Sequence, residues 1–76
     1  MTAARRFPGD IVQDAARLWN ISIDDILGPR RDQRACSARW AVMAALDDLG
    51  WSSTKIGNYL NRDHTTVLWG LGRLNR

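Results

Sequence analysis

The sequence is poor in the residues that catalytic and metal sites require. Its 76 residues include one cysteine, Cys36, and one histidine, His64. A single thiol excludes an internal disulfide and a cysteine-rich metal site. His64 has no second histidine or cysteine with which to hold zinc, and no separate carboxylate motif completes a catalytic set with it. We therefore expect no catalytic residue, no metal and no cofactor.

Long apolar runs and strand-like alternation are also absent. No stretch approaches the length of about 20 residues that crosses a membrane, and residues 1–6 lack the apolar segment of a secretory signal. The chain has no P-loop, so it carries no ATPase chemistry of its own. These absences predict a cytoplasmic all-α chain with no membrane association and no small-molecule substrate.

Arginine is abundant and unevenly distributed. The chain has a net charge of +3 and a pI near 10.0, and ten of its eleven basic residues are Arg. Residues 1–28 carry three Arg and four Asp, whereas residues 29–76 carry eight basic residues and four Asp. This excess favours a polyanionic partner, because arginine binds phosphate and guanine in a bidentate manner. A solvated basic face is the alternative.

Apolar residues at spacings of three and four predict one small helical domain, residues 10–76, after a flexible arm, residues 1–9. The predicted helices lie between Asp10 and Asn20, Ser22 and Gly28, Ala35 and Leu49, Ser52 and Asn61, and His64 and Leu74. Asp10, Ser22 and Ser52 are expected N-caps. The third helix is expected to be central. The inward-facing set includes Leu18, Trp19, Ile23, Ile26, Trp40, Met43, Leu46, Leu49, Trp51, Ile56, Tyr59 and Leu60.

Residues 56–74 have the pattern of two packed helices joined by a tight turn at Asn61. Asn61 tolerates the left-handed conformation that such a turn needs, and Gly57 is expected where the two helices press together. Asp63 is expected to cap the second helix by accepting from an amide near Thr66. The first turn of that helix, starting at His64, is then exposed, as in the recognition helix of a helix-turn-helix.

The segment Arg62-Asp63-His64-Thr65-Thr66-Val67 resembles the signature of the DNA-binding domain, domain IV, of the bacterial replication initiator DnaA. The resemblance extends back through Ile56-Gly57 and the basic pair Arg30-Arg31, and covers the chain from about Asp10 to Arg73. It implies a small all-α bundle with a helix-turn-helix, DnaA domain IV-like or Trp repressor-like. It also implies double-stranded DNA as the partner.

The resemblance implies a role for each element of the pattern. Asp63, His64 and Thr65 would contact bases in the major groove, with Thr66 nearer the backbone. The residue matching the minor-groove arginine is Arg31, and the residue matching a phosphate contact is Arg39. The complete set expected to contact DNA is Arg30, Arg31, Arg34, Arg39, Ser53, Thr54, Lys55, Arg62, Asp63, His64, Thr65 and Thr66.

Several positions depart from the DnaA pattern. Ser53 and Thr54 replace apolar residues, Lys55 replaces an acidic or polar residue, and Trp69 stands where a histidine is common. The turn at Asn61 is short, and the chain starts with Met and ends soon after the recognition helix. We therefore interpret it as the nucleoid-associated DNA-binding domain of a DnaA-like transcriptional or phage-type regulator.

Two alternatives remain open at this point. One is a domain IV fragment of a DnaA initiator that binds origin boxes. The other, of a different class, is a protein-interaction module on the same fold. If the chain binds DNA, we expect any protein partners to bind through residues outside this chain.

Overall fold

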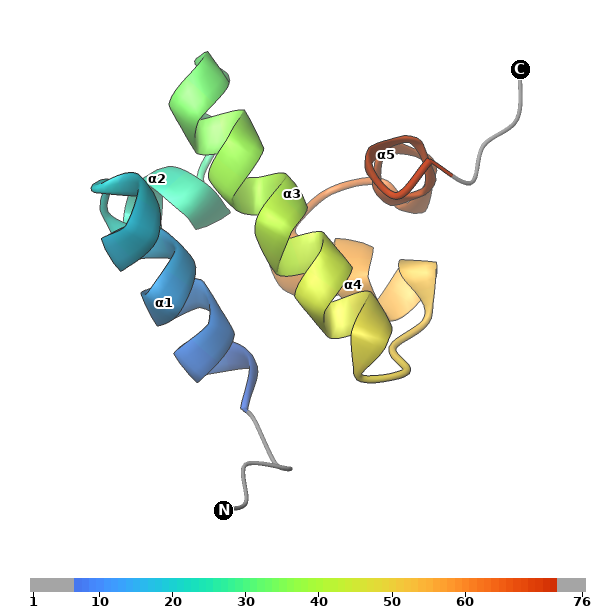
Figure 1. Cartoon of the computed structure of the whole chain (residues 1–76). Coiled ribbons are helices and arrows are strands. Elements are labelled where there is room, and N and C mark those ends of the chain that lie inside the picture. The colour runs from blue at the N-terminus through green and yellow to red at the C-terminus, as the bar shows by residue number, and fades with distance from the viewer. Residues whose placement is uncertain (1–6, 73–76) are drawn as a thin grey trace.

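The structure of the chain, a computed structural model, describes residues 7–72, which form five helices and no strand. The helices are α1 (Pro8–Trp19), α2 (Ile23–Leu27), α3 (Gln33–Asp48), α4 (Ser53–Leu60) and α5 (His64–Gly70). α3 runs through the middle, with α1 and α2 on one side and α4 and α5 on the other (Figure 1). It contacts all four other helices. The all-α bundle with a helix-turn-helix and the central third helix are therefore confirmed.

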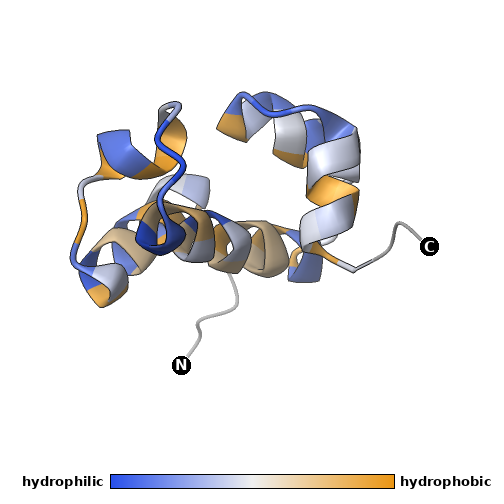
Figure 2. Cartoon of the chain, turned by 90° about the horizontal axis from the view of Figure 1, so that it is seen from above, coloured by the Kyte–Doolittle hydropathy of each residue, from blue (hydrophilic) through white to orange (hydrophobic). Residues whose placement is uncertain are grey.

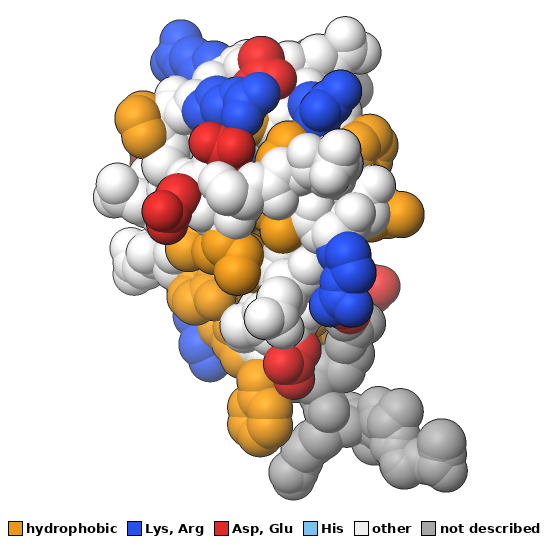
Figure 3. Space-filling model, turned by 90° about the vertical axis from the view of Figure 1, so that its left-hand side faces the viewer, with side chains coloured by type: hydrophobic (Ala, Val, Ile, Leu, Met, Phe, Trp, Pro, Cys, Tyr) orange, Lys and Arg blue, Asp and Glu red, His pale blue; other side chains and the backbone are white. Residues whose placement is uncertain are grey.

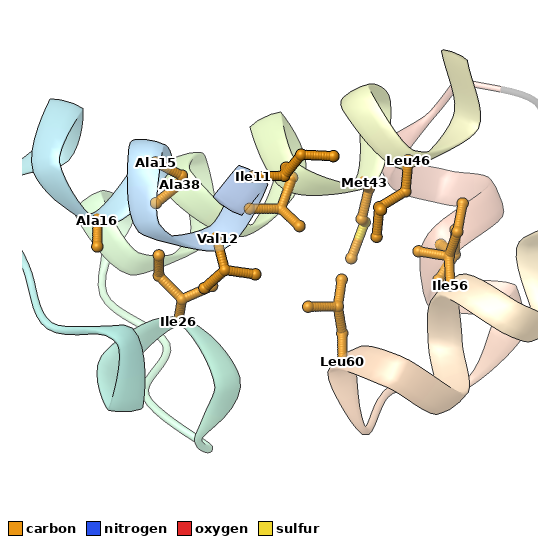
Figure 4. Close-up of a cluster of buried hydrophobic side chains, with 12 residues drawn as sticks. Ile11, Val12, Ala15, Ala16, Ile26, Ala38, Met43, Leu46, Ile56 and Leu60 are labelled. Atoms are coloured by element: carbon orange, nitrogen blue, oxygen red, sulfur yellow. The ribbon is translucent and has the colours of Figure 1, made fainter. Parts of the chain in front are cut away.

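One apolar cluster joins the two halves of the bundle through α3. On one side Val12 of α1 lies close to Ile26 of α2, and on the other Leu46 of α3 lies near Ile56 and Leu60 of α4 (Figure 4). All five side chains are at most 1% exposed. Burying an aliphatic side chain of this size contributes about 1.5–3 kcal/mol, so this shared cluster is what fixes α4 and α5 against the rest.

The predicted helix ends are well supported by polar side chains. Ser22 and Asp25 form a capping box, in which the Asp25 amide donates to Ser22 Oγ at 3.0 Å and the Ser22 amide donates to the Asp25 carboxylate. Ser52 Oγ accepts from the Lys55 amide at 3.1 Å. Asn20 ends α1 in the left-handed conformation, with φ of 56°. The caps expected at Ser22 and Ser52, and the stop at Asn20, are confirmed.

The first helix begins earlier than predicted. α1 starts at Pro8, and Asp10 lies in its first turn, so the N-cap expected at Asp10 was wrong. Proline suits the first helical position because its φ is already helical and its missing N–H needs no partner there. Of the expected flexible arm, residues 1–6 lie outside the described part of the chain.

The last helix is shorter than predicted. α5 ends at Gly70, and the expected end at Leu74 lies outside the described residues. Gly72 has φ of +74°, a conformation that side chains other than glycine rarely adopt. Its amide donates to the carbonyl of Trp69 at 3.0 Å. Gly72 therefore lies just past the end of α5 and terminates it. At that position a glycine is favoured, whereas inside a helix it would be costly.

Several residues expected in the core are exposed. They are Leu18 at 78%, Trp40 at 51%, Leu49 at 41%, Ile23 at 38% and Tyr59 at 36%. Leu18 lines an open groove between α1 and α3, and Leu49 lies just past the end of α3 as its C-cap. Figure 3 shows uncovered apolar side chains on the α1 side of the molecule. Trp19 and Trp51 do pack against the core, each partly buried. None of the described helices has the length and apolar character needed to cross a membrane.

Two glycines permit close approach of helices. A Cβ at Gly57 would lie 2.5 Å from the carbonyl oxygen of Arg62 and 3.3 Å from the amide nitrogen of His64. A Cβ at Gly70 would lie 2.9 Å from Trp40 Cδ1 and 3.0 Å from Met43 Sδ. Gly57 thus lets the start of α5 lie directly on α4, as the sequence predicts.

Replacing Gly57 with alanine should destabilise the domain, because the backbone at Arg62 cannot move away without shifting α5. We expect Gly57→Ala to lower the free energy of unfolding by about 1–3 kcal/mol in urea denaturation followed by circular dichroism. The matched control is Gly9→Ala in α1, where a Cβ would meet nothing within 4 Å. That change should be neutral or stabilise by up to about 1 kcal/mol. Equal stability of Gly57→Ala and wild type would contradict this packing.

Candidate nucleic-acid interface

The connection between α4 and α5, residues 61–63, contains one left-handed residue. Asn61 has φ of 58°, and its amide donates to the carbonyl of Asn58. The amide of Arg62 donates to the carbonyl of Gly57 at 2.7 Å. These bonds close the turn over the C-terminal end of α4 and set α5 at a fixed angle to it. The predicted conformation of Asn61 is confirmed.

The first turn of α5 presents a row of polar side chains. Asp63, His64 and Thr66 are exposed, and Thr65 is half-buried. Asp63 occupies the N-cap position but its side chain accepts no cap hydrogen bond. Its carboxylate instead lies 3.3 Å from His64 Nδ1. Asp63 is thus the N-cap residue as predicted, but the predicted hydrogen bond from its side chain to the helix was wrong. The carboxylate lies beside the imidazole of His64 instead.

The connection between α2 and α3 is strongly hydrophilic (Figure 2). Within it Arg30 is committed to two carboxylates: its guanidinium donates to Asp25 at 2.6 Å and to Asp32 through a second, short bond. The bond to Asp32 raises the pKa of Arg30 and lowers the pKa of Asp32. Arg31 is exposed and forms no ion pair within the described residues. Of this basic pair, Arg31 is the one whose charge is available to a partner.

Arg39 is not on the surface. It is 4% exposed, and its guanidinium donates to the carbonyls of Ile26 at 2.8 Å, Arg30 at 2.8 Å, Asp25 at 3.2 Å and Gly28 at 3.3 Å. Such a side chain cannot reach a phosphate on the outside of the domain. The phosphate contact expected of Arg39 is therefore not supported, and its role in the structure is to bind the backbone between α2 and α3.

Arg62 is also turned inward. It donates to the carbonyls of Leu60 and Asn61, both at 3.1 Å, and to Gly28 at 2.6 Å. Burial lowers the pKa of its guanidinium, and the positive charges of Arg39 and Arg31 lower it further. An arginine nevertheless stays charged at any pH of interest. The side chain of Arg62, predicted to contact DNA, is half-buried and makes its hydrogen bonds within the chain.

The basic loop and the helix-turn-helix are neighbours in space. A surface depression of about 390 Å³ is lined by Pro29, Arg31, Asn61 and Arg62. Its walls come from the α2–α3 connection and from the α4–α5 turn. The two segments, 30 residues apart in sequence, therefore form one continuous surface.

The remaining site residues lie at the starts of two helices. Arg34 belongs to the first turn of α3, since that helix begins at Gln33 and not at Ala35 as predicted. In the first turn of α4, Thr54 is exposed and Ser53 is half-buried. The ammonium of Lys55 lies 4.2 Å from the centre of the Trp51 ring, a cation–π contact that holds this side chain at the surface.

Two exposed tryptophans, one within α5 and one packed against it, were not among the residues predicted to contact DNA. Trp69 is 60% exposed and follows Thr65 by four residues, so it lies one turn further along the same helix face. Trp40 of α3 covers Gly70 at the other edge of α5. Helical spacing from Thr65 was a usable signal for Trp69. For Trp40 no such signal existed, because its exposure depends on how α5 packs on α3.

Other kinds of site are not evident in the described part of the chain. No group of three His, Cys, Asp or Glu side chains there is arranged to hold a metal ion. Cys36 is a free thiol that donates to the carbonyl of Arg31 and accepts from Arg39.

Comparison with known proteins gives a consistent result. A model of the family described as "Bacterial dnaA protein helix-turn-helix" matches residues 8–73. The chromosomal replication initiator protein DnaA of Clavibacter sepedonicus is 38% identical over 64 residues, covering 82% of this chain and 13% of that relative. The same protein of Leifsonia xyli subsp. xyli is 36% identical, covering 82% and 14%. That of Bifidobacterium animalis subsp. lactis is 36% identical, covering 80% and 11%. No solved structure gives a significant match.

Removing the Arg39 guanidinium should take a donor from four backbone carbonyls, of which only that of Gly28 keeps a second one, from Arg62. We expect Arg39→Met to lower the free energy of unfolding by about 3 kcal/mol, since several charge-assisted hydrogen bonds are lost together. The control is Arg34→Met on the exposed first turn of α3, which should change stability by less than about 0.5 kcal/mol. Urea denaturation of both variants makes the comparison. Equal stability of the two would show that the buried bonds contribute nothing net.

Proposed function

The chain belongs to the family of bacterial DnaA helix-turn-helix domains, and on this premise we propose that it binds double-stranded DNA sequence-specifically. The observation that carries the proposal is the contiguity of two elements. The exposed Arg31 lines one depression together with Asn61 and Arg62, and these two turn residues lead directly into Asp63 and the exposed first turn of α5. A duplex lying across that surface would offer its major groove to α5 and the neighbouring minor groove to Arg31.

Direct reading of bases falls to the first turn of α5. The carboxylate of Asp63 can accept from a cytosine amino group, and His64 can donate to guanine N7 or to a phosphate. Thr65 offers a hydroxyl and a methyl, which suit an adenine edge or a thymine methyl. Thr66 is exposed, and its hydroxyl would donate to a backbone phosphate.

Arg31 is the proposed minor-groove residue. A narrow A·T-rich minor groove concentrates negative potential and attracts an unpaired guanidinium. Arg30 is less suited to this role, because Asp25 and Asp32 neutralise it. Arg34, Ser53, Thr54 and Lys55 are proposed as flanking phosphate contacts. Arg39 and Arg62 are omitted from the contact set because their guanidiniums bind backbone carbonyls.

The biological role we propose is that of a replication initiator's DNA-binding domain. The relatives named above are all chromosomal replication initiators, and the matched region is 11% to 14% of their length. Nothing in the comparisons supports the transcriptional or phage-type regulator that the sequence first suggested. The ATP-dependent steps of initiation would depend on other domains, because this chain contains no P-loop.

The proposal predicts salt-sensitive, sequence-selective binding. We expect fluorescence anisotropy to show tighter binding to a duplex carrying a DnaA-type box than to a scrambled duplex. With roughly four phosphate contacts, affinity should fall about a hundredfold between about 50 and 200 mM salt. Salt-sensitive binding without box preference would leave a DNA-binding domain with another site. A lack of binding at low salt would favour the protein-interaction module.

The two arginines of the basic loop should differ in their effect on binding. We expect Arg31→Ala to weaken binding to the preferred duplex about ten- to a hundredfold, because it removes the groove contact. Arg30→Ala removes the same formal charge but should cost less than about fivefold at near-physiological salt. Anisotropy titrations of both variants make the comparison. A larger loss for Arg30→Ala would contradict the assignment of Arg31 to the groove.

A further inference from the structure

Two arginines from different parts of the chain converge on one carbonyl. The carbonyl oxygen of Gly28, at the end of α2, accepts from Arg39 at 3.3 Å and from Arg62 at 2.6 Å. Arg39 comes from α3 and Arg62 from the turn before α5. A carbonyl oxygen has two lone pairs, so both bonds can form together. Gly28 is thereby the point at which the basic loop and the helix-turn-helix are joined.

Each arginine also binds its own side of this junction. Arg39 holds the carbonyls of Asp25, Ile26 and Arg30, which fixes the backbone that carries Arg31. Arg62 holds the carbonyls of Leu60 and Asn61, which are the end of α4 and the turn itself. Three of the five N–H groups of Arg62 are therefore used within the chain.

From this geometry we propose that Arg62 is a positioning residue, which sets the distance between Arg31 and the first turn of α5. The inference rests on the proposed function, because that distance matters only if both segments contact one duplex. In the complex it would fix the number of base pairs between the minor-groove contact and the major-groove contact. Specificity for this spacing would then come from a residue that touches no DNA.

The planar guanidinium is suited to this role in a way that lysine is not. Its N–H groups point in fixed directions, so one side chain can bind carbonyls on two separate segments simultaneously. An ammonium at this position could reach one segment or the other. A phosphate contact, in contrast, depends mainly on charge, and lysine would largely preserve it.

The test uses the whole chain and duplexes selected from random DNA by the wild-type protein. Dimethyl sulfate protection maps the guanines covered in the major groove and the adenines covered in the minor groove. A second duplex then carries one additional base pair between the two protected segments. Affinities are measured for wild type, Arg62→Lys, Arg62→Ala and Arg31→Ala, and for each Arg62 variant combined with Arg31→Ala. Circular dichroism melts verify that every variant is folded at the temperature used.

We expect wild type to lose about tenfold or more on the duplex with the additional base pair. Arg62→Lys and Arg62→Ala should each lose less than about threefold in affinity between the two duplexes. When Arg31→Ala is added to either of these Arg62 variants, it should lower affinity only slightly. Arg34→Ala is the matched control. It should lower the slope of log affinity against log salt concentration by about one, and its effect on the binding free energy should add to that of Arg31→Ala.

Other results would overturn the inference. If Arg62→Lys binds like wild type while Arg62→Ala loses affinity equally on both duplexes, Arg62 is a phosphate contact. If Arg31→Ala lowers affinity as much in the Arg62 variants as in wild type, Arg62 likewise does not position Arg31. If the wild-type protein protects neither groove, the proposed function itself is wrong, and the inference is rejected with it.

Discussion

The buried guanidinium of Arg39 is the interaction on which the arrangement of this domain depends. α2 has only five residues, so its carbonyls have few partners within their own helix. Arg39 donates to the carbonyls of Asp25 and Ile26 within α2 and to those of Gly28 and Arg30 in the connection that follows it. Removing a charge from water is costly, and the four carbonyl bonds offset that cost. A single side chain from the central helix thus binds both a short helix and the irregular connection that follows it.

The acidic residues near the candidate interface follow a common pattern. Asp32 and Asp63 each stand at the N-cap of a helix, and neither side chain caps it. Asp32 binds Arg30, and Asp63 lies beside His64. A side-chain cap contributes about 1 kcal/mol, and α5 lacks that contribution from Asp63. The carboxylate of Asp32 instead occupies the guanidinium of Arg30, and that of Asp63 lies against the imidazole of His64.

The sequence was sufficient to predict the order of the helices, the caps at Ser22 and Ser52, and the left-handed turn at Asn61. These features depend on local spacing and local hydrogen bonds, which a single sequence contains. The roles of Arg39 and Arg62 depend on backbone carbonyls that are distant along the chain, and no local pattern encodes them. Arg39 does share the helical face of Ala35 and Val42, at spacings of four and three. Its periodicity therefore indicated burial, but the family resemblance suggested a phosphate contact.

Trp40 and Gly70 show how the recognition helix is tied to the central helix by shape. The indole lies so close to Gly70 that a methyl group there would come within 2.9 Å of it. The two positions therefore cannot vary independently. A smaller residue at position 40 would leave only the flexible thioether of Met43 within 3.0 Å of a side chain at position 70, whereas tryptophan excludes one. Among related sequences, a large residue at one position should thus coincide with a small one at the other, a covariation imposed by packing rather than by the partner.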